Sequence, residues 1–175
     1  NFNSTPRNGW EIDPFGLSQS FSHLRRLSGM ENTVITRMHY QMKNYLAERK
    51  SLEFQWKQQW CEDDISMDGL FTHILPFAYD TSHMCGFDDK ICLDLTEGLL
   101  GERQSLVPSH NTFEETAVKL LEQFRKQSML FQTKNLLIPM GGDFRWNSDY
   151  EWTQGIDYLQ RIITYINMQE SFNTE

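Results

Sequence analysis

Residues 9–18 read GWEIDPFGLS and carry the signals for a strand, a turn and the start of a helix. We expect a short strand over Gly9–Asp13, which Pro14 ends because proline has no amide hydrogen for a central sheet ladder. Ser18 can then cap a helix that runs through Leu27 and is followed by a glycine stop. A strand followed directly by a helix predicts the first unit of an α/β fold.

The next segments repeat this alternation. The β-branched run at 33–36 predicts a second strand, and 40–50 has the composition of a helix. The alternating apolar residues of 52–56 predict an extended segment, and the apolar stretch 70–79 is ambiguous. Four further segments are expected: a loop-rich stretch over 81–111 with turns at Gly86, Gly98 and Gly101; a helix from the Thr112/Glu115 capping box to about Phe131; a buried strand over 135–140; and a last helix from about Asp149.

Apolar side chains at helical spacing predict which helix faces point inward. We expect Phe21, Leu24 and Leu27 on one face of the first helix; Ala117, Leu120, Leu121 and Phe124 on the apolar face of the 112–131 helix; and Trp152, Ile156, Leu159, Ile163 and Ile166 as the inner stripe of the last helix. The order of strands and helices predicts an α/β fold with mainly parallel strands. Since another strand would follow the last helix in such a pattern, residues 1–175 are expected to be a single domain that forms part of a larger β/α barrel.

Composition narrows the class of protein. The chain has 175 residues, is 39% hydrophobic and carries a formal net charge of -8, which suits one domain with a real core. The excess of acidic residues disfavours a nucleic-acid partner. No uncharged apolar run approaches the ~18 residues of a membrane span, which leaves an anchor elsewhere in a parent protein open. The sequon Asn3-Ser4-Thr5 and the cysteines favour the secretory pathway.

The cysteines leave two possibilities open. Cys85 and Cys92 are close enough in sequence for a small disulfide loop, but two free buried thiols fit their spacing as well. Cys61 has no evident partner.

Polar residues follow three of the expected strands, at Asp13, at Arg37 and at Asp143. The carboxyl ends of strands are where α/β sheets and barrels place their sites. Two aspartates with an arginine suit glycoside hydrolysis, in which one carboxylate attacks the sugar and the other protonates the leaving oxygen. The alternative is that both aspartates are ordinary turn or cap residues.

Other polar residues give weaker signals. The five histidines form no compact ligand pair and are expected to be surface or satisfied core residues. The acidic cluster at 62–64 with Asp68 is expected to be a solvated loop, with a calcium site as the alternative.

Five ordered blocks of the chain carry a family resemblance: residues 9–16, 37–40, 52–56, 79–86 and 136–145. Together they resemble glycoside hydrolase family 38, the α-mannosidases of the Golgi and the lysosome, and the match is nearest to the Golgi branch. The resemblance covers nearly the whole chain. It implies part of a seven-stranded β/α barrel, namely the central part of the N-terminal catalytic domain, incomplete at both ends.

The resemblance also implies roles for individual residues. Asp13 falls on the catalytic nucleophile, which is also a zinc ligand, and Asp143 falls on the general acid/base. Arg37, Tyr79, Asp80 and His83 fall on substrate-binding positions, and Cys85 and Cys92 fall on a disulfide of the family. The implied function is retaining, zinc-dependent hydrolysis of α-mannosidic bonds in N-glycans, in the secretory pathway and specifically the Golgi lumen.

The sequence departs from the family at several points. The His-x-Asp pair and the further histidine that complete the zinc site have no counterpart in residues 1–175, so this chain alone is expected to be inactive. Leu17 stands where the signature has histidine, and Gly142 stands where the Golgi enzymes have a first aspartate. The alternatives are a non-catalytic, glycan-binding relative and, on weaker grounds, an unrelated metal-dependent carbohydrate hydrolase or deacetylase on a similar barrel.

Overall fold

The computed structural model describes residues 3–58, 69–100 and 111–169. Contacts within the chain divide it into two compact units. The first comprises residues 1–76 and 129–132, and the second comprises 77–128 and 133–175. The expectation that residues 1–175 form one domain stays a prediction.

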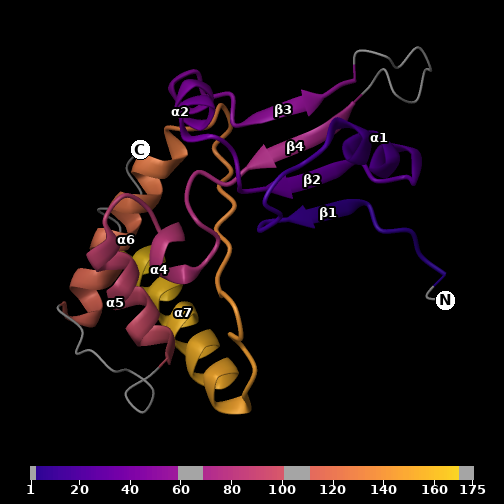
Figure 1. Cartoon of the computed structure of the whole chain (residues 1–175). Helices are drawn as coiled ribbons and strands as arrows, with labels where there is room; N and C mark the ends of the chain where they lie inside the picture. The colour runs from indigo at the N-terminus through magenta and orange to yellow at the C-terminus, as the bar shows by residue number, and fades with distance from the viewer. Residues whose placement is uncertain (1–2, 59–68, 101–110, 170–175) are drawn as a thin grey trace. The chain divides into compact units, whose positions relative to one another are not determined.

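The first unit is built on a four-stranded sheet of order β1-β2-β4-β3 (Figure 1). The strands β1 (Asn8–Glu11), β2 (Asn32–Ile35) and β4 (Leu70–Ile74) are parallel, and β3 (Glu53–Trp56) lies antiparallel beside β4. The predicted α/β class with mainly parallel strands is therefore confirmed for this sheet. The described residues form one four-stranded sheet, so they do not show the seven-stranded barrel that the family resemblance implies.

The described residues of this unit form two helices, α1 (Gln19–Leu27) and α2 (Tyr40–Glu48). Ser18 caps α1 as predicted, because its Oγ accepts a hydrogen bond from the Phe21 amide at 3.2 Å. The predicted face of Phe21, Leu24 and Leu27 is largely exposed. Arg25 reaches the sheet instead, where it donates to Thr33 Oγ1 at 2.8 Å and pairs with Glu11.

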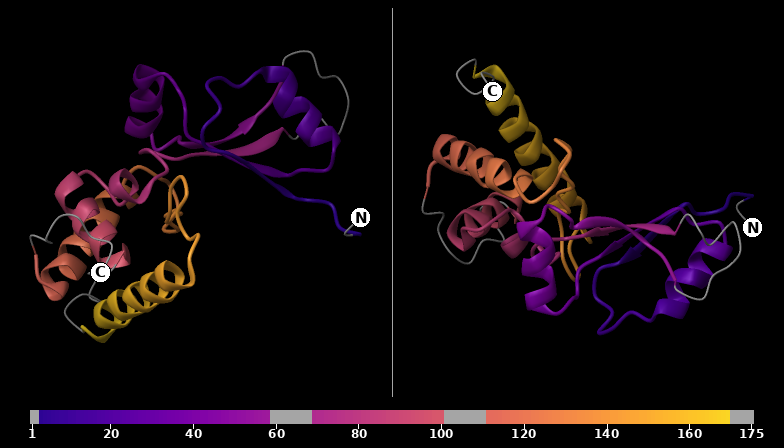
Figure 2. Two further views of the ribbon diagram at one scale, coloured as in Figure 1. Left: turned by 60° about the horizontal axis from the view of Figure 1, so that its bottom comes forward. Right: turned by 90° about the horizontal axis from the view of Figure 1, so that it is seen from above.

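The second unit is helical and contains α4 (Thr81–Met84), α5 (Asp89–Leu100), α6 (Phe113–Ser128) and α7 (Asp149–Met168). Figure 2 shows α5, α6 and α7 packed beside one another. Their shared core consists of Cys85, Ile91, Cys92, Leu95, Leu99, Ala117, Leu120 and Ile162. The capping box before α6 is confirmed, since the Glu115 amide donates to Thr112 Oγ1 at 3.2 Å and the Thr112 amide donates to Glu115 Oε2 at 3.0 Å.

The expectation of a loop over 81–111 is wrong, because α4 and α5 occupy much of it. Gly98 suggested a turn, yet it lies inside α5. A Cβ at this position would lie 2.0 Å from the Tyr158 ring, so Gly98 lets α5 and α7 approach closely. Gly101 and His110 lie outside the described residues, as do Cys61 and the acidic cluster.

The expected buried strand at 135–140 is also wrong. The segment is partly exposed and has no regular structure, and no strand lies beside it in the described part of its unit. A segment forms a strand only where a neighbouring strand pairs with the N–H and C=O groups of its backbone. Here the carbonyl of Met140 instead accepts a hydrogen bond from Trp146 Nε1 at 2.9 Å.

The inner stripe of α7 was predicted only in part. Trp152, Ile156 and Ile163 are about half exposed, whereas Leu159 and Ile166 pack against the core. The fully buried positions are Glu151, Gly155 and Ile162. The helix is therefore rotated from the predicted orientation, which buries the small Gly155 against the Trp146 ring. No helix in the described ranges combines the length and apolar character needed to cross a membrane.

Candidate functional site

Asp13 and Arg37 come together at the carboxyl ends of β1 and β2. The last residues of these strands, Glu11 and Ile35, are register partners in the parallel pair, and Asp13 and Arg37 each follow two positions later. Arg37 Nε donates to Asp13 Oδ1 at 2.7 Å, and Nη2 of the same guanidinium contacts this oxygen. The predicted strand-end arrangement is confirmed for these two residues.

This ion pair is accessible to solvent. The side chains of Asp13 and Arg37 are 43% and 49% exposed, so the pair contributes little to stability. The Arg37 guanidinium also lies 4.6 Å from the centre of the Phe15 ring, which adds a cation–π contact. Arg37 thus orients the Asp13 carboxylate while leaving it open to a ligand.

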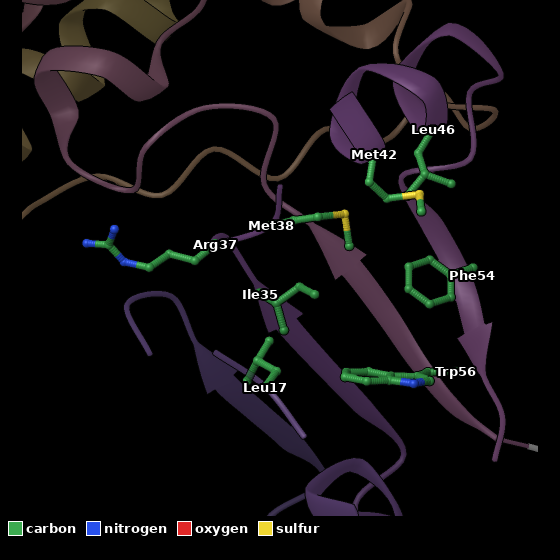
Figure 3. Close-up of a pocket in the computed structure, with 8 residues that line it drawn as sticks. All are labelled: Leu17, Ile35, Arg37, Met38, Met42, Leu46, Phe54 and Trp56. Atoms are coloured by element: carbon green, nitrogen blue, oxygen red, sulfur yellow. The ribbon is translucent and has the colours of Figure 1, made fainter. Parts of the chain in front are cut away.

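A cavity of about 430 Å³ lies beside this pair, within the first unit. Its lining is mostly apolar: Leu17, Ile35, Arg37, Met38, Met42, Leu46, Phe54 and Trp56 (Figure 3). Figure 3 shows Arg37 pointing away from the apolar side chains, whereas Leu17 lies next to Ile35. Leu17, which stands in place of the signature histidine, therefore serves as an apolar packing residue here.

Tyr79 and Asp143 meet in the second unit, although 64 positions separate them in sequence. The Tyr79 hydroxyl donates to Asp143 Oδ1 at 3.2 Å. Asp143 is exposed, as a carboxyl group that exchanges protons with a ligand must be. The site of this unit thus joins a predicted substrate-binding residue to the predicted acid/base.

Asp80 and His83 form a second pair, at the start of α4. The Asp80 carboxylate accepts a hydrogen bond from His83 Nδ1 at 2.7 Å and another from the Ser82 hydroxyl. Burial alone would raise the pKa of Asp80, but these two hydrogen bonds outweigh it and hold the pKa below its ordinary value. Asp80 is therefore ionised at neutral pH and presents an acceptor beside an exposed imidazole.

The disulfide implied by the family resemblance is present between Cys85 and Cys92, whose Cα atoms are 5.3 Å apart. It joins the end of α4 to the first turns of α5, and both cysteines are fully buried. The bridge anchors the segment that carries Tyr79, Asp80 and His83 to the core of the second unit.

Two further histidines, His39 and His73, act as structural residues, as predicted. The His39 ring caps α2 by accepting a hydrogen bond from the Gln41 amide at 3.3 Å. His73 is buried in β4 with its Nδ1 2.9 Å from Glu53, and its ring stacks on Phe131.

A buried ion pair that sequence reasoning missed supports the segment after Asp143. Arg145 Nε donates to Glu151 Oε1, and the two side chains are only 17% and 4% exposed. Burial alone would raise the pKa of Glu151, but the bonds from Arg145 and from nearby backbone amides hold it below the ordinary value. Sequence spacing gives no sign of which charges become buried, so only the fold reveals this pair.

We expect Glu151→Ala to lower the free energy of unfolding of this unit by about 3–5 kcal/mol, because it leaves the Arg145 charge buried without its partner. Amide hydrogen exchange over residues 143–155 in the parent protein measures this loss. The pKa of Glu151 is lower in the folded protein than its ordinary value of 4.5. The ionised Glu151 therefore stabilises the folded state fully at pH values above 4.5, and this stabilisation is lost as the pH falls through the lower, folded-state pKa. Unchanged exchange in Glu151→Ala would contradict the assignment, and the exposed Asp157→Ala serves as control.

The described residues do not by themselves fit a zinc ion. Among them, no three His, Cys, Asp or Glu side chains are grouped so that they could hold a metal. Asp13 offers one carboxylate, and one of its oxygens already accepts from Arg37. A zinc site at Asp13 would therefore need ligands from elsewhere.

Comparisons with known proteins give the chain its family. Residues 1–174 match the family described as "Glycosyl hydrolases family 38 N-terminal domain". The chain is 38% identical to mouse "Alpha-mannosidase 2x", with 100% of the chain and 16% of that protein covered. It is also 38% identical to "Alpha-mannosidase 2" of Arabidopsis thaliana, with 97% and 15% covered, and to the human protein of that name, with 100% and 16% covered.

The chain thus spans about a sixth of the length of these relatives, all of which are named as α-mannosidases. The match runs through both units, from the Asp13–Arg37 pair to the Tyr79–Asp143 pair. The chain belongs to glycoside hydrolase family 38.

Proposed function

We propose that these residues form part of a retaining α-mannosidase in which Asp13 is the nucleophile and Asp143 is the general acid/base. The observation that carries the proposal is the Asp13–Arg37 pair, an accessible carboxylate oriented by an arginine at the ends of two parallel strands. Family membership supplies the reaction class, and the contact of Tyr79 with Asp143 supports a role for the second carboxyl group.

In the proposed reaction, Asp13 attacks the anomeric carbon of an α-mannoside while the bond from that carbon to the leaving oxygen breaks. Asp143 gives its proton to the leaving oxygen, which departs as the alcohol. Asp143, now ionised, then takes a proton from water, whose oxygen displaces Asp13 from the anomeric carbon. Two inversions give retention, a course that requires the two carboxyl groups to lie about 5–5.5 Å apart in the working enzyme.

Arg37, Tyr79, Asp80 and His83 are proposed to bind the substrate. Arginine donors and ionised carboxylates are strong hydrogen-bond partners for sugar hydroxyls. The lowered pKa of Asp80 supports this role, because the carboxylate stays an acceptor well below neutral pH. The proposed substrates are mannose-containing N-glycans.

We also propose that the working enzyme holds one zinc ion, to which Asp13 contributes one ligand. The other ligands would come from parts of the parent protein beyond residues 1–175, where the rest of a seven-stranded barrel would also lie. Zinc would supply Lewis-acid character and a template for sugar hydroxyls. The proposed location is the Golgi lumen, and the disulfide suits such an oxidising compartment.

The test is hydrolysis of an aryl α-mannoside by the parent protein, with and without a zinc chelator. We expect hydrolysis that falls by about 100-fold or more on chelation, since a Lewis acid contributes several kcal/mol to such a reaction. Activity should return when zinc is restored, and the metal content of the purified protein should be one zinc per chain.

A folded, zinc-supplied parent protein that hydrolyses no α-mannoside would contradict the proposal. It would favour the alternative of a non-catalytic, glycan-binding relative, for which Leu17 in the apolar cavity is the supporting observation. Binding of a mannose-rich glycan, measured by calorimetry, would then test that alternative.

A further inference from the structure

Thr81 and Gly141 join the two segments that carry the site of the second unit. The Thr81 amide and hydroxyl both donate to the Gly141 carbonyl, at 2.8 Å and 2.9 Å. The Gly141 amide donates in return to Thr81 Oγ1 at 2.8 Å. Thr81 is only 1% exposed, so these three bonds form a closed arrangement whose Thr81 side is buried.

The segment held by this arrangement has an unusual backbone. Gly141 and Gly142 have φ angles of +152° and +151°, and Phe144 and Trp146 have φ angles of +60° and +61°. A positive φ angle at a non-glycine residue costs on the order of 1–3 kcal/mol of conformational free energy, and such a conformation persists only where surrounding contacts fix it. Asp143 lies in the middle of this strained segment, so the direction of its carboxyl group depends on those contacts.

Thr81 lies close to both partners of the Tyr79–Asp143 hydrogen bond. Tyr79 precedes Thr81 by two positions, and Asp143 follows Gly141 by two positions. The segments also touch at Gly142, where an added Cβ would lie 3.4 Å from Asp80 Cβ. A shift of Gly141 away from Thr81 would therefore move Asp143 relative to both Tyr79 and Asp80.

We propose that Thr81 is a positioning residue for the acid/base, which holds Gly141 so that Asp143 stays aligned with the Tyr79 hydroxyl and with the leaving oxygen of the substrate. This inference rests on the proposed function. In this role, Thr81 itself touches neither the substrate nor the reacting atoms. Its hydroxyl acts through the backbone of Gly141.

The test uses Thr81→Val in the parent protein, which keeps the shape of the side chain but removes the hydroxyl. The Gly141 amide then loses its buried acceptor, a change that costs about 1–3 kcal/mol.

Two substrates with different leaving groups are compared. Phenyl α-mannoside has a leaving group that needs protonation, because a phenol has a pKa of about 10. 2,4-Dinitrophenyl α-mannoside has a leaving group that departs without a proton.

We expect kcat/KM for phenyl α-mannoside to fall by about 10-fold or more, and that for the dinitrophenyl substrate to change by less than about threefold. Thr81→Ser, which keeps the hydroxyl, should retain most of the wild-type kcat/KM for phenyl α-mannoside. Thr116→Val is the matched control, since Thr116 is equally buried but lies in α6. This variant should change kcat/KM by the same factor for the two substrates.

A second measurement does not depend on activity. Hydrogen exchange of the amides over residues 139–146 should speed up about 10-fold in Thr81→Val and remain unchanged in Thr116→Val, because the strained segment loses its anchor. If Thr81→Val does not fold, Thr81→Ala is measured in the same way.

Three outcomes overturn the inference. Equal losses for the two substrates would mean that Thr81 does not act through proton transfer, and unchanged exchange would mean that it does not hold the segment. In both cases the proposed function stands if the wild-type parent is active. If the wild-type parent hydrolyses neither substrate, the proposed function fails and the inference fails with it.

Discussion

Replacement of Asp13 by alanine in the parent protein is expected to lower kcat/KM for an aryl α-mannoside by about 10⁴-fold or more, the size of loss typical of removing an active-site nucleophile. The physical reason is that no other group would attack the anomeric carbon from the side that Asp13 occupies. Because Arg37 loses its partner in this variant, stability must be measured alongside the rate. An exposed pair of this kind contributes little to stability, so we expect the variant to fold.

The control for this prediction is Glu31→Ala, which breaks another exposed ion pair of the first unit, with Arg7. It should leave the rate unchanged. Azide supplies a further check, because a small anion can enter the space left by Asp13 and attack in its place. The product should then be the mannosyl azide of inverted, β configuration. Wild-type activity in Asp13→Ala would contradict its role as the nucleophile.

Replacement of Asp143 by alanine is expected to lower kcat/KM for phenyl α-mannoside by about 10²–10⁴-fold, the usual contribution of a general acid. The loss should be much smaller with 2,4-dinitrophenyl α-mannoside, whose leaving group needs no proton. Azide should accelerate breakdown of the mannosyl-enzyme in this variant, since its attack needs no general base. The product should be the azide of retained, α configuration, opposite to that from Asp13→Ala.

The control for Asp143 is Asp157→Ala, which removes an exposed carboxylate of α7. It should behave as the wild type with both substrates. If Asp143→Ala loses the same factor with both leaving groups, Asp143 is not the proton donor. An inverted azide product from Asp143→Ala would also contradict the assignment, because it would show that no covalent intermediate precedes azide attack.

The parts of the fold that follow from local signals could be predicted from the sequence. Ser18 and Thr112 cap their helices because each side-chain oxygen accepts a hydrogen bond from the backbone amide only three positions later. The Asp13–Arg37 pair was also predictable, because residues at the ends of adjacent parallel strands must emerge at one edge of the sheet.

The features that sequence reasoning missed depend on contacts between distant segments. Gly98 suggests a turn until Tyr158 is seen packed against it. The apolar run at 135–140 suggests a strand, but the described residues of its unit include no strand with which it could pair. Thr81 and Gly141 are 60 positions apart, and no spacing rule links a threonine to such a partner.

Trapping the covalent intermediate in the parent protein tests directly whether Asp13 is the nucleophile of a retaining enzyme. A 5-fluoro-substituted α-mannosyl fluoride slows both steps, because fluorine opposes the positive charge of the oxocarbenium-like transition state, while the fluoride leaving group lets the first step proceed. We expect a mannosyl adduct on the peptide that contains Asp13, and α-mannose as the first product from a normal substrate. An adduct on another residue, or β-mannose as the first product, would contradict it.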